Sequence, residues 1–210
     1  MNKNYIAIID YGMGNLRSVY KALEILGHPA IITDSPEIIE KSSGIILPGV
    51  GAFGALMDNM KTKGLIKPLL EQIEAGKQYL GICVGLQILF EKGYEKGTHQ
   101  GLGIFPGDVI HFHNLPANLK VPHMGWNSVS LKKDNKLFCG IQNEDMFYFV
   151  HSYHAATSNE DIISATTNYG YEFVSGVHHD NIHGIQFHPE KSGRLGQIIL
   201  NNFAINCLMG

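Results

Sequence analysis

Apolar residues in the first part of the chain form short continuous runs that alternate with segments of helical spacing. A run that is apolar throughout is typical of a strand buried on both faces. Such runs predict strands at residues 5–9, 30–33, 44–47 and 78–82, and Pro48 should end the third of them. Helical spacing predicts helices at residues 16–26, 36–39, from about 52, and at 65–74. Alternating strands and helices predict an α/β fold with right-handed crossovers, a mostly parallel central sheet and helices on both faces.

The later part of the chain predicts short strands with few helices between them. His179-Asp180-Asn181 has the composition of a hairpin turn, so we expect an added antiparallel region in the C-terminal half. The expected strands are 109–112, 126–131, 147–150, 162–167, 173–177 and 182–187, and a closing helix is expected from Leu195 to Phe203. Because no repeat, low-complexity segment or linker interrupts the pattern, residues 1–210 are predicted to form a single domain.

Composition narrows the class of protein. The 210 residues are 44% hydrophobic and 17% charged, which is typical of a globular chain. The formal charge of −3 gives no basic field for nucleic acid or an anionic membrane. The apolar runs are too short to span a bilayer, and the first residues lead into a strand without the apolar region of a secretory signal. We therefore expect a cytoplasmic protein.

Cysteine and histidine usage offers no metal site or disulfide framework. Cys83, Cys139 and Cys207 form no C-x-x-C pair, and an odd number of widely spaced cysteines suits a reducing compartment. The eleven histidines, among them His28, His99, His111, His113 and His123, are scattered without a paired ligand spacing. Most are expected in loops or on the surface, and no cofactor is predicted.

Gly81-Ile82-Cys83-Val84-Gly85-Leu86-Gln87 is the most informative segment. It lies between an apolar strand and a helix-like run over residues 86–91, which is where a nucleophile elbow is found. A side chain at Gly81 or Gly85 would collide with the neighbouring strand or helix, and the start of the helix would favour a thiolate. The competing interpretation is a free cysteine that only packs in the core.

Two other segments supply what a cysteine nucleophile needs. Pro48-Gly49-Val50-Gly51 follows the third strand, where bare amides can bind an oxyanion, although alone it is typical of a simple turn. His188-Pro189-Glu190 places an imidazole at a strand end with a carboxylate two residues later, a pairing suited to a general base and its orienting partner. A lone histidine is more often structural, but the three segments together predict acyl transfer.

These motifs together resemble class I (triad-type) glutamine amidotransferases over nearly the whole chain. Further segments, Asp10 to Asn15, Val121 to Asn127, Tyr148 to Tyr153 and Lys191, resemble the glutaminase subunits of imidazole glycerol phosphate synthases. The resemblance implies that Cys83 attacks the carboxamide of glutamine, with His188 as general base and acid and Glu190 as its partner.

The resemblance also implies roles for residues around the triad. Gly49, Val50, Gly51 and Val84 would supply the oxyanion hole, whose loop peptide reorients in the family. The residues implied to line the glutamine pocket are Gln87, Glu95, His151, Ser152 and Tyr153. For His151 and Tyr153, packing at a strand end is the alternative.

In such enzymes the ammonia passes to a cyclase subunit with a (βα)8 barrel, as a heterodimer, in histidine biosynthesis. Asn15, Trp126, Tyr148 and Lys191 match positions that face the cyclase, and an isolated tryptophan in a Gly-flanked loop suits an interface. For Trp126 the alternative is core packing. Two alternatives for the chain remain open: a paralogue that supplies ammonia to a surface-sugar amidation enzyme, and a non-catalytic binding domain.

Overall fold

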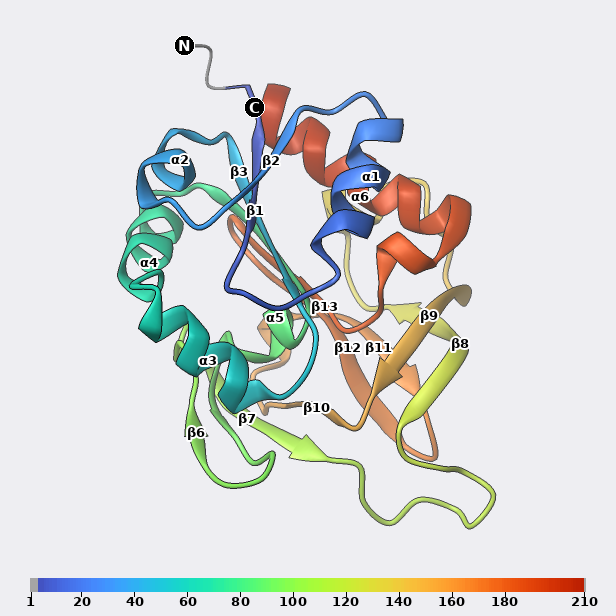
Figure 1. The fold of residues 1–210 in the computed structure, drawn as a ribbon. Helices are drawn as coiled ribbons and strands as arrows, with labels where there is room; N and C mark the ends of the chain where they lie inside the picture. Colours follow the sequence, from blue (N-terminus) through green and yellow to red (C-terminus); the bar gives the residue numbers. More distant parts are fainter. Residues whose placement is uncertain (1–3, 210) are drawn as a thin grey trace.

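Four strands from the first part of the chain and one from near its end form a parallel sheet in the computed structural model, which describes residues 4–209 (Figure 1). Their order is β2 (Ala30–Thr33), β1 (Ile6–Ile9), β3 (Gly44–Gly49), β4 (Gln78–Cys83) and β13 (Ile182–Ile185), each parallel to its neighbours. Every residue of β1, β3 and β13 is buried. The predicted parallel α/β core is confirmed.

Helices cover both faces of this sheet (Figure 1). Contacts group α1 (Leu16–Ile25) with the closing helix α6 (Gly193–Met209), and α2 (Pro36–Lys41) with α4 (Ile66–Glu74). The helix α3 (Phe53–Thr62) follows the loop after β3. The buried residues of α1 and α4 recur at helical spacing, so the apolar stripe of each helix faces the sheet.

Antiparallel strands extend the sheet beyond β13, as predicted. From β12 (Glu172–His179) the order continues through β10 (Tyr153–Ala156), β7 (Phe105–His111), β5 (Phe90–Gly93) and β6 (His99–Gln100), with only β5 and β7 parallel. A branch of β11 (Ile163–Asn168), β8 (His123–Leu131) and β9 (Asp145–His151) starts from β12. The short 3-10 turns are η1 (Lys136–Phe138), η2 (Glu160–Ile162) and η3 (Pro189–Lys191).

Two predicted boundaries near the centre are wrong. Pro48 does not end its strand, because β3 continues to Gly49. Pairing with β1 stops at Ile46, so Pro48 has only β4 beside it, and a residue without an N–H is tolerated at such a local edge. The run expected to be helical over residues 86–91 forms one turn, α5 (Val84–Gln87), and then β5 from Phe90, because the chain there pairs with β7.

Within residues 4–209, no helix combines the length and the apolar character needed to cross a membrane.

Candidate active site

Cys83 lies at the sharp turn between β4 and α5. Its backbone has φ 55° and ψ −109°, a conformation that residues with a side chain rarely adopt and that costs free energy unless the surroundings enforce it. The side chain is 5% exposed. Positive φ at a residue between strand and helix is the backbone of a nucleophile elbow. Because α5 is a single turn, its dipole contributes less to a thiolate than the longer helix expected from the sequence.

Gly81 and Gly85, on either side of Cys83, lie where the backbone leaves no room for a side chain. A β-carbon at Gly81 would overlap the carbonyl oxygen of Gly85, and one at Gly85 would overlap the carbonyl oxygen of Leu47 in β3. The hydroxyl of Tyr79 donates to that Gly85 carbonyl at 2.8 Å. Any side chain at either glycine would therefore push the turn away from the sheet, as the motif predicted.

His188 follows β13 and lies beside the nucleophile. Its Nδ1 is 2.8 Å from Glu190 Oε1, and these two side chains are only 3% and 2% exposed. The backbone is fixed on both sides, since His188 N donates to the Tyr148 carbonyl at 2.9 Å and Ser192 Oγ donates to the His188 carbonyl at 2.7 Å. Nδ1 is thus committed to Glu190, and Nε2 is the ring nitrogen left for proton transfer.

Electrostatics favour a protonated His188. Burial by itself would lower the pKa of this imidazole, but its interactions with Cys83 and Glu190 raise the pKa to about 10. His188 Nε2 is buried without a well-formed hydrogen bond to any residue in the described range, and the same is true of Glu190 Oε2. The arrangement supports an imidazolium that stands ready to protonate a leaving group.

One cavity of about 510 Å³ collects the residues predicted from the motifs. Cys83 and His188 open into it together with Lys191, while Glu190 is buried behind His188. The residues predicted for the oxyanion hole and for glutamine binding all line it: Gly49, Val50, Gly51, Val84, Gln87, Glu95, His151, Ser152 and Tyr153. Lys96 and Pro122 also line this cavity and were not predicted as site residues, although Pro122 lies in the segment Val121 to Asn127 that carried part of the resemblance.

One amide of the loop after β3 is engaged by Tyr11, a residue to which sequence reasoning gave no role of its own. The N–H of Val50 donates to the hydroxyl of Tyr11 at 3.1 Å. Tyr11 is 1% exposed, and burial raises the pKa of its hydroxyl to about 12, so it stays neutral. Val84 begins α5, where a backbone N–H has no partner within the helix. In this state, therefore, the Val50 amide is engaged by Tyr11, whereas the Val84 amide has no acceptor within α5.

Several polar atoms of the predicted glutamine pocket bind one another. Gln87 Nε2 donates to the Tyr153 carbonyl at 2.8 Å, and His151 Nδ1 lies 2.8 Å from the same oxygen. Glu95 Oε2 accepts from the N–H of Phe53 at 3.0 Å, at the start of α3. These side chains shape the wall of the cavity, and their direct contact with glutamine stays a prediction.

Five histidines are buried. His151 and His188 were predicted for the site, whereas His123, His154 and His183 depart from the expectation that most histidines lie in loops or at the surface. His123 Nδ1 and His151 Nε2 are 3.0 Å apart, and the ring of His123 stacks on Phe149. Burial lowers the pKa of His123 to about 4 and that of His151 well below its usual value, so both are neutral. Among residues 4–209, no group of three or more His, Cys, Asp or Glu side chains is arranged to hold a metal ion.

Three of the four residues predicted to face a partner lie together on β8, β9 and η3. Trp126 is 53% exposed, its ring centroid is 6.2 Å from that of Tyr148, and Lys191 Nζ lies 5.8 Å from the Tyr148 ring. Exposure of Trp126 excludes the alternative of core packing. Asn15 precedes α1, which contacts η3, and its Oδ1 accepts from Ser18 Oγ at 2.7 Å.

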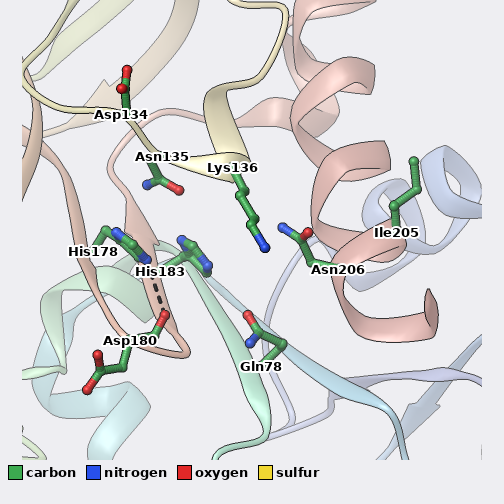
Figure 2. Close-up of a pocket in the computed structure, with 9 residues that line it drawn as sticks. All are labelled: Gln78, Asp134, Asn135, Lys136, His178, Asp180, His183, Ile205 and Asn206. Atoms are coloured by element: carbon green, nitrogen blue, oxygen red, sulfur yellow. Dashed lines mark hydrogen bonds between the residues drawn. The ribbon is translucent and has the colours of Figure 1, made fainter. Parts of the chain in front are cut away.

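A second cavity, of about 530 Å³, is lined by the residues drawn in Figure 2 and lies at the end of β4 opposite to Cys83. Gln78, the first residue of β4, and His183 of β13 line it, and Figure 2 shows Lys136 directed inward from η1. Gln78 and Cys83 are separated by the length of β4, roughly 16 Å at the usual rise per residue. The described residues that line this second cavity include no cysteine, serine or threonine, so acyl transfer is assigned to the first.

Comparisons with known proteins agree with this geometry. Residues 7–207 match the family described as "Glutamine amidotransferase class-I". The chain is 50% identical over 198 residues to "Imidazole glycerol phosphate synthase subunit HisH" of Desulfitobacterium hafniense, covering 94% of this chain and 92% of the relative. It is 47% identical over 197 residues to the protein of the same name from Aquifex aeolicus, covering 93% and 94%.

Solved structures show the same fold at lower identity. A putative GMP synthase protein from Thermoplasma acidophilum superposes with a TM-score of 0.74 at 21% identity, covering 99% of this chain and 95% of that chain. PurLQS from Thermotoga maritima gives a TM-score of 0.72 at 19% identity, covering 99% and 98%. With an elbow cysteine, a buried histidine–carboxylate pair and a family match over almost its whole length, this chain belongs to the class-I glutamine amidotransferase family.

Proposed function

We propose that this chain, as a single domain, is the glutaminase subunit of an imidazole glycerol phosphate synthase and acts in histidine biosynthesis. It hydrolyses glutamine to glutamate and ammonia and delivers the ammonia to a cyclase subunit with a (βα)8 barrel, which makes imidazole glycerol phosphate and aminoimidazole-carboxamide ribotide. The observation that carries the chemistry is the placement of Cys83 at a strained elbow, in the same cavity as a His188 that is bound to Glu190.

The reaction begins with attack of the Cys83 sulfur, as thiolate, on the carboxamide carbon of glutamine. A carbon–sulfur bond forms, and the carbonyl oxygen becomes an oxyanion that accepts from the Val84 amide and, once the Val50 N–H has turned from Tyr11, from the β3 loop. His188 Nε2 gives its proton to the nitrogen, the carbon–nitrogen bond breaks, and ammonia leaves a γ-glutamyl thioester. Each oxyanion donor is worth roughly 3–4 kcal/mol of transition-state stabilisation.

Water completes the cycle. Neutral His188 takes a proton from the attacking water, a carbon–oxygen bond forms, and the carbon–sulfur bond breaks to release glutamate and regenerate the Cys83 thiolate with a protonated His188. Glu190 keeps Nδ1 protonated through both steps, since its Oε1 is 2.8 Å away. The balance is glutamine plus water giving glutamate plus ammonia.

A partner surface lies next to the cavity. Trp126 is exposed beside Tyr148, and Met124 and Met146, 62% and 45% exposed, lie on the same two paired strands. A cluster of exposed aromatic and methionine side chains on one face is typical of a protein interface. Lys191 reaches both this surface and the cavity. The surface therefore supports transfer of ammonia to a docked cyclase, with Asn15 at its margin.

The test is glutamine hydrolysis by the full chain, with and without a cognate cyclase and the cyclase's nucleotide ligand. We expect weak hydrolysis alone, strong stimulation by the loaded cyclase, and loss of activity in Cys83→Ala. Activity that survives in Cys83→Ala would refute the catalytic assignment. Stimulation only by the barrel subunit of a surface-sugar amidation enzyme would identify the chain as the paralogue, and a wild-type chain inactive with either partner would make it a binding domain.

A further inference from the structure

Gln186, which follows β13, is a buried amide that contacts the nucleophile. Its side chain is 0% exposed, and its Nε2 donates to Cys83 Sγ at 3.5 Å. Its backbone N–H donates to the Ser175 carbonyl in β12 at 2.9 Å, which fixes the segment in place. The same five-residue segment thus presents an amide donor to the sulfur and then His188 and Glu190.

The orientation of the Gln186 amide is set by its neighbours. Gln87 Nε2 donates both to the Tyr153 carbonyl, at 2.8 Å, and to Gln186 Oε1, at 3.1 Å. Since a carbonyl can only accept, the nitrogen of Gln87 must face Tyr153, and the group of Gln186 that faces Gln87 must be its oxygen. The NH₂ group of Gln186 therefore points at the sulfur, and a relay from Tyr153 through Gln87 and Gln186 ends on Cys83.

We propose that Gln186 is a positioning residue that holds the sulfur of Cys83 and stabilises its thiolate by N–H donation. This role rests on the proposed glutaminase chemistry. A hydrogen bond to an ionised acceptor is stronger than one to a neutral acceptor, so the contact favours the thiolate over the thiol. It also fixes the sulfur when His188 has given up its proton and no longer offers a positive charge. Gln87 then acts on the nucleophile through Gln186, in addition to shaping the cavity wall.

The proposal is tested by the pH dependence of Cys83 alkylation with iodoacetamide, using the isolated full chain and mapping the modified peptide by mass spectrometry. In Gln186→Glu a carboxylate replaces the donor at nearly constant shape, and in Gln186→Met the hydrogen bond is removed. We expect the midpoint of alkylation to rise by about one pH unit or more in both variants, a roughly tenfold loss of thiolate at a given pH. Gln87→Met, which releases the amide of Gln186, should shift it less.

Ser175→Ala is the matched control, because it removes a buried hydroxyl that bonds to Thr167 Oγ1 at 2.9 Å, next to Gln186 but away from the sulfur. Its alkylation profile should coincide with that of the wild type. Thermal unfolding establishes that each variant is folded, and with cyclase present the Gln186 variants should lose kcat about tenfold with little change in KM. Wild-type alkylation profiles in folded Gln186 variants would overturn the proposal, whereas absence of glutaminase activity in the wild type would refute only the proposed function.

Discussion

Replacing Tyr11 by phenylalanine should raise the glutaminase activity of the isolated chain. The Tyr11 hydroxyl accepts the N–H of Val50 at 3.1 Å, so it engages an amide of the loop that the proposed reaction uses to bind the oxyanion. Tyr11→Phe keeps the buried ring and removes only this acceptor. Without this hydrogen bond, less free energy is needed to turn the Val50 amide towards the cavity, which Val50 already lines.

The magnitude follows from one neutral hydrogen bond. Its net contribution of about 0.5–1.5 kcal/mol corresponds to a roughly two- to tenfold larger population of loops with the Val50 N–H directed at the oxyanion. Hydrolysis by the isolated chain should rise by that factor. Stimulation by the loaded cyclase should fall by a similar factor, because the hydrolysis rate of the complex with cyclase changes little. With the pKa of Tyr11 near 12, the effect should be constant across the neutral range.

The assay is glutamate release by the wild type and the variant, with and without cyclase and ligand. Tyr5→Phe is the control, because the Tyr5 hydroxyl also bonds to the backbone, donating to the Ile38 carbonyl at 2.8 Å. Tyr5 precedes β1, whereas Tyr11 follows the end of that strand. Tyr5→Phe should leave hydrolysis unchanged. A folded Tyr11→Phe chain with wild-type or lower basal activity would show that the Val50 amide is not held back by this contact.

Three further outcomes are expected. Burial lowers the pKa of His123 to about 4 and that of His183 to about 3, so between those values and about 6.5 the unfolded chain binds more protons than the folded chain. The free energy of unfolding, measured by urea denaturation, should therefore fall as the pH drops through this window. The fall should be less steep in His183→Gln. Gly85→Ala should destabilise the fold by about 1–3 kcal/mol or more and abolish hydrolysis, since the new methyl meets the Leu47 carbonyl; a stable, active variant in thermal unfolding and activity assays would contradict the elbow geometry. Trp126→Ala should weaken cyclase binding at least about tenfold by calorimetry while leaving basal hydrolysis intact, and unchanged affinity would exclude this face.

Local pattern predicted the parts of the molecule that depend on nearest neighbours in the chain. The apolar runs of β1 and β3 predicted buried parallel strands, because a strand covered on both faces needs no polar alternation. The glycines around Cys83 predicted the elbow, since their spacing reflects a steric requirement of the turn itself. A histidine and a carboxylate two residues apart predicted their own hydrogen bond.

Three short strands that depend on a distant partner, β5, β6 and β10, were not predicted. A helix-like run was expected over residues 86–91, yet residues 90–93 form β5 because β7 offers backbone partners. The burial of His123, His154 and His183 was not predicted, for a related reason. His123 and His151 are polar in any sequence scale, and only their mutual hydrogen bond and the surrounding rings allow them to be buried as neutral groups.

The sequence by itself determined the chemistry of the site: a cysteine at a glycine-flanked turn, a bare-amide loop and a histidine–glutamate pair. Only the tertiary structure decided the state of that chemistry. Tyr11 engages Val50 across 39 residues of chain, and Gln186 reaches Cys83 across 103. Such contacts leave no local periodicity, because they arise where packed strands bring side chains together. They determine that the Val50 amide is engaged and that the Cys83 sulfur accepts a hydrogen bond.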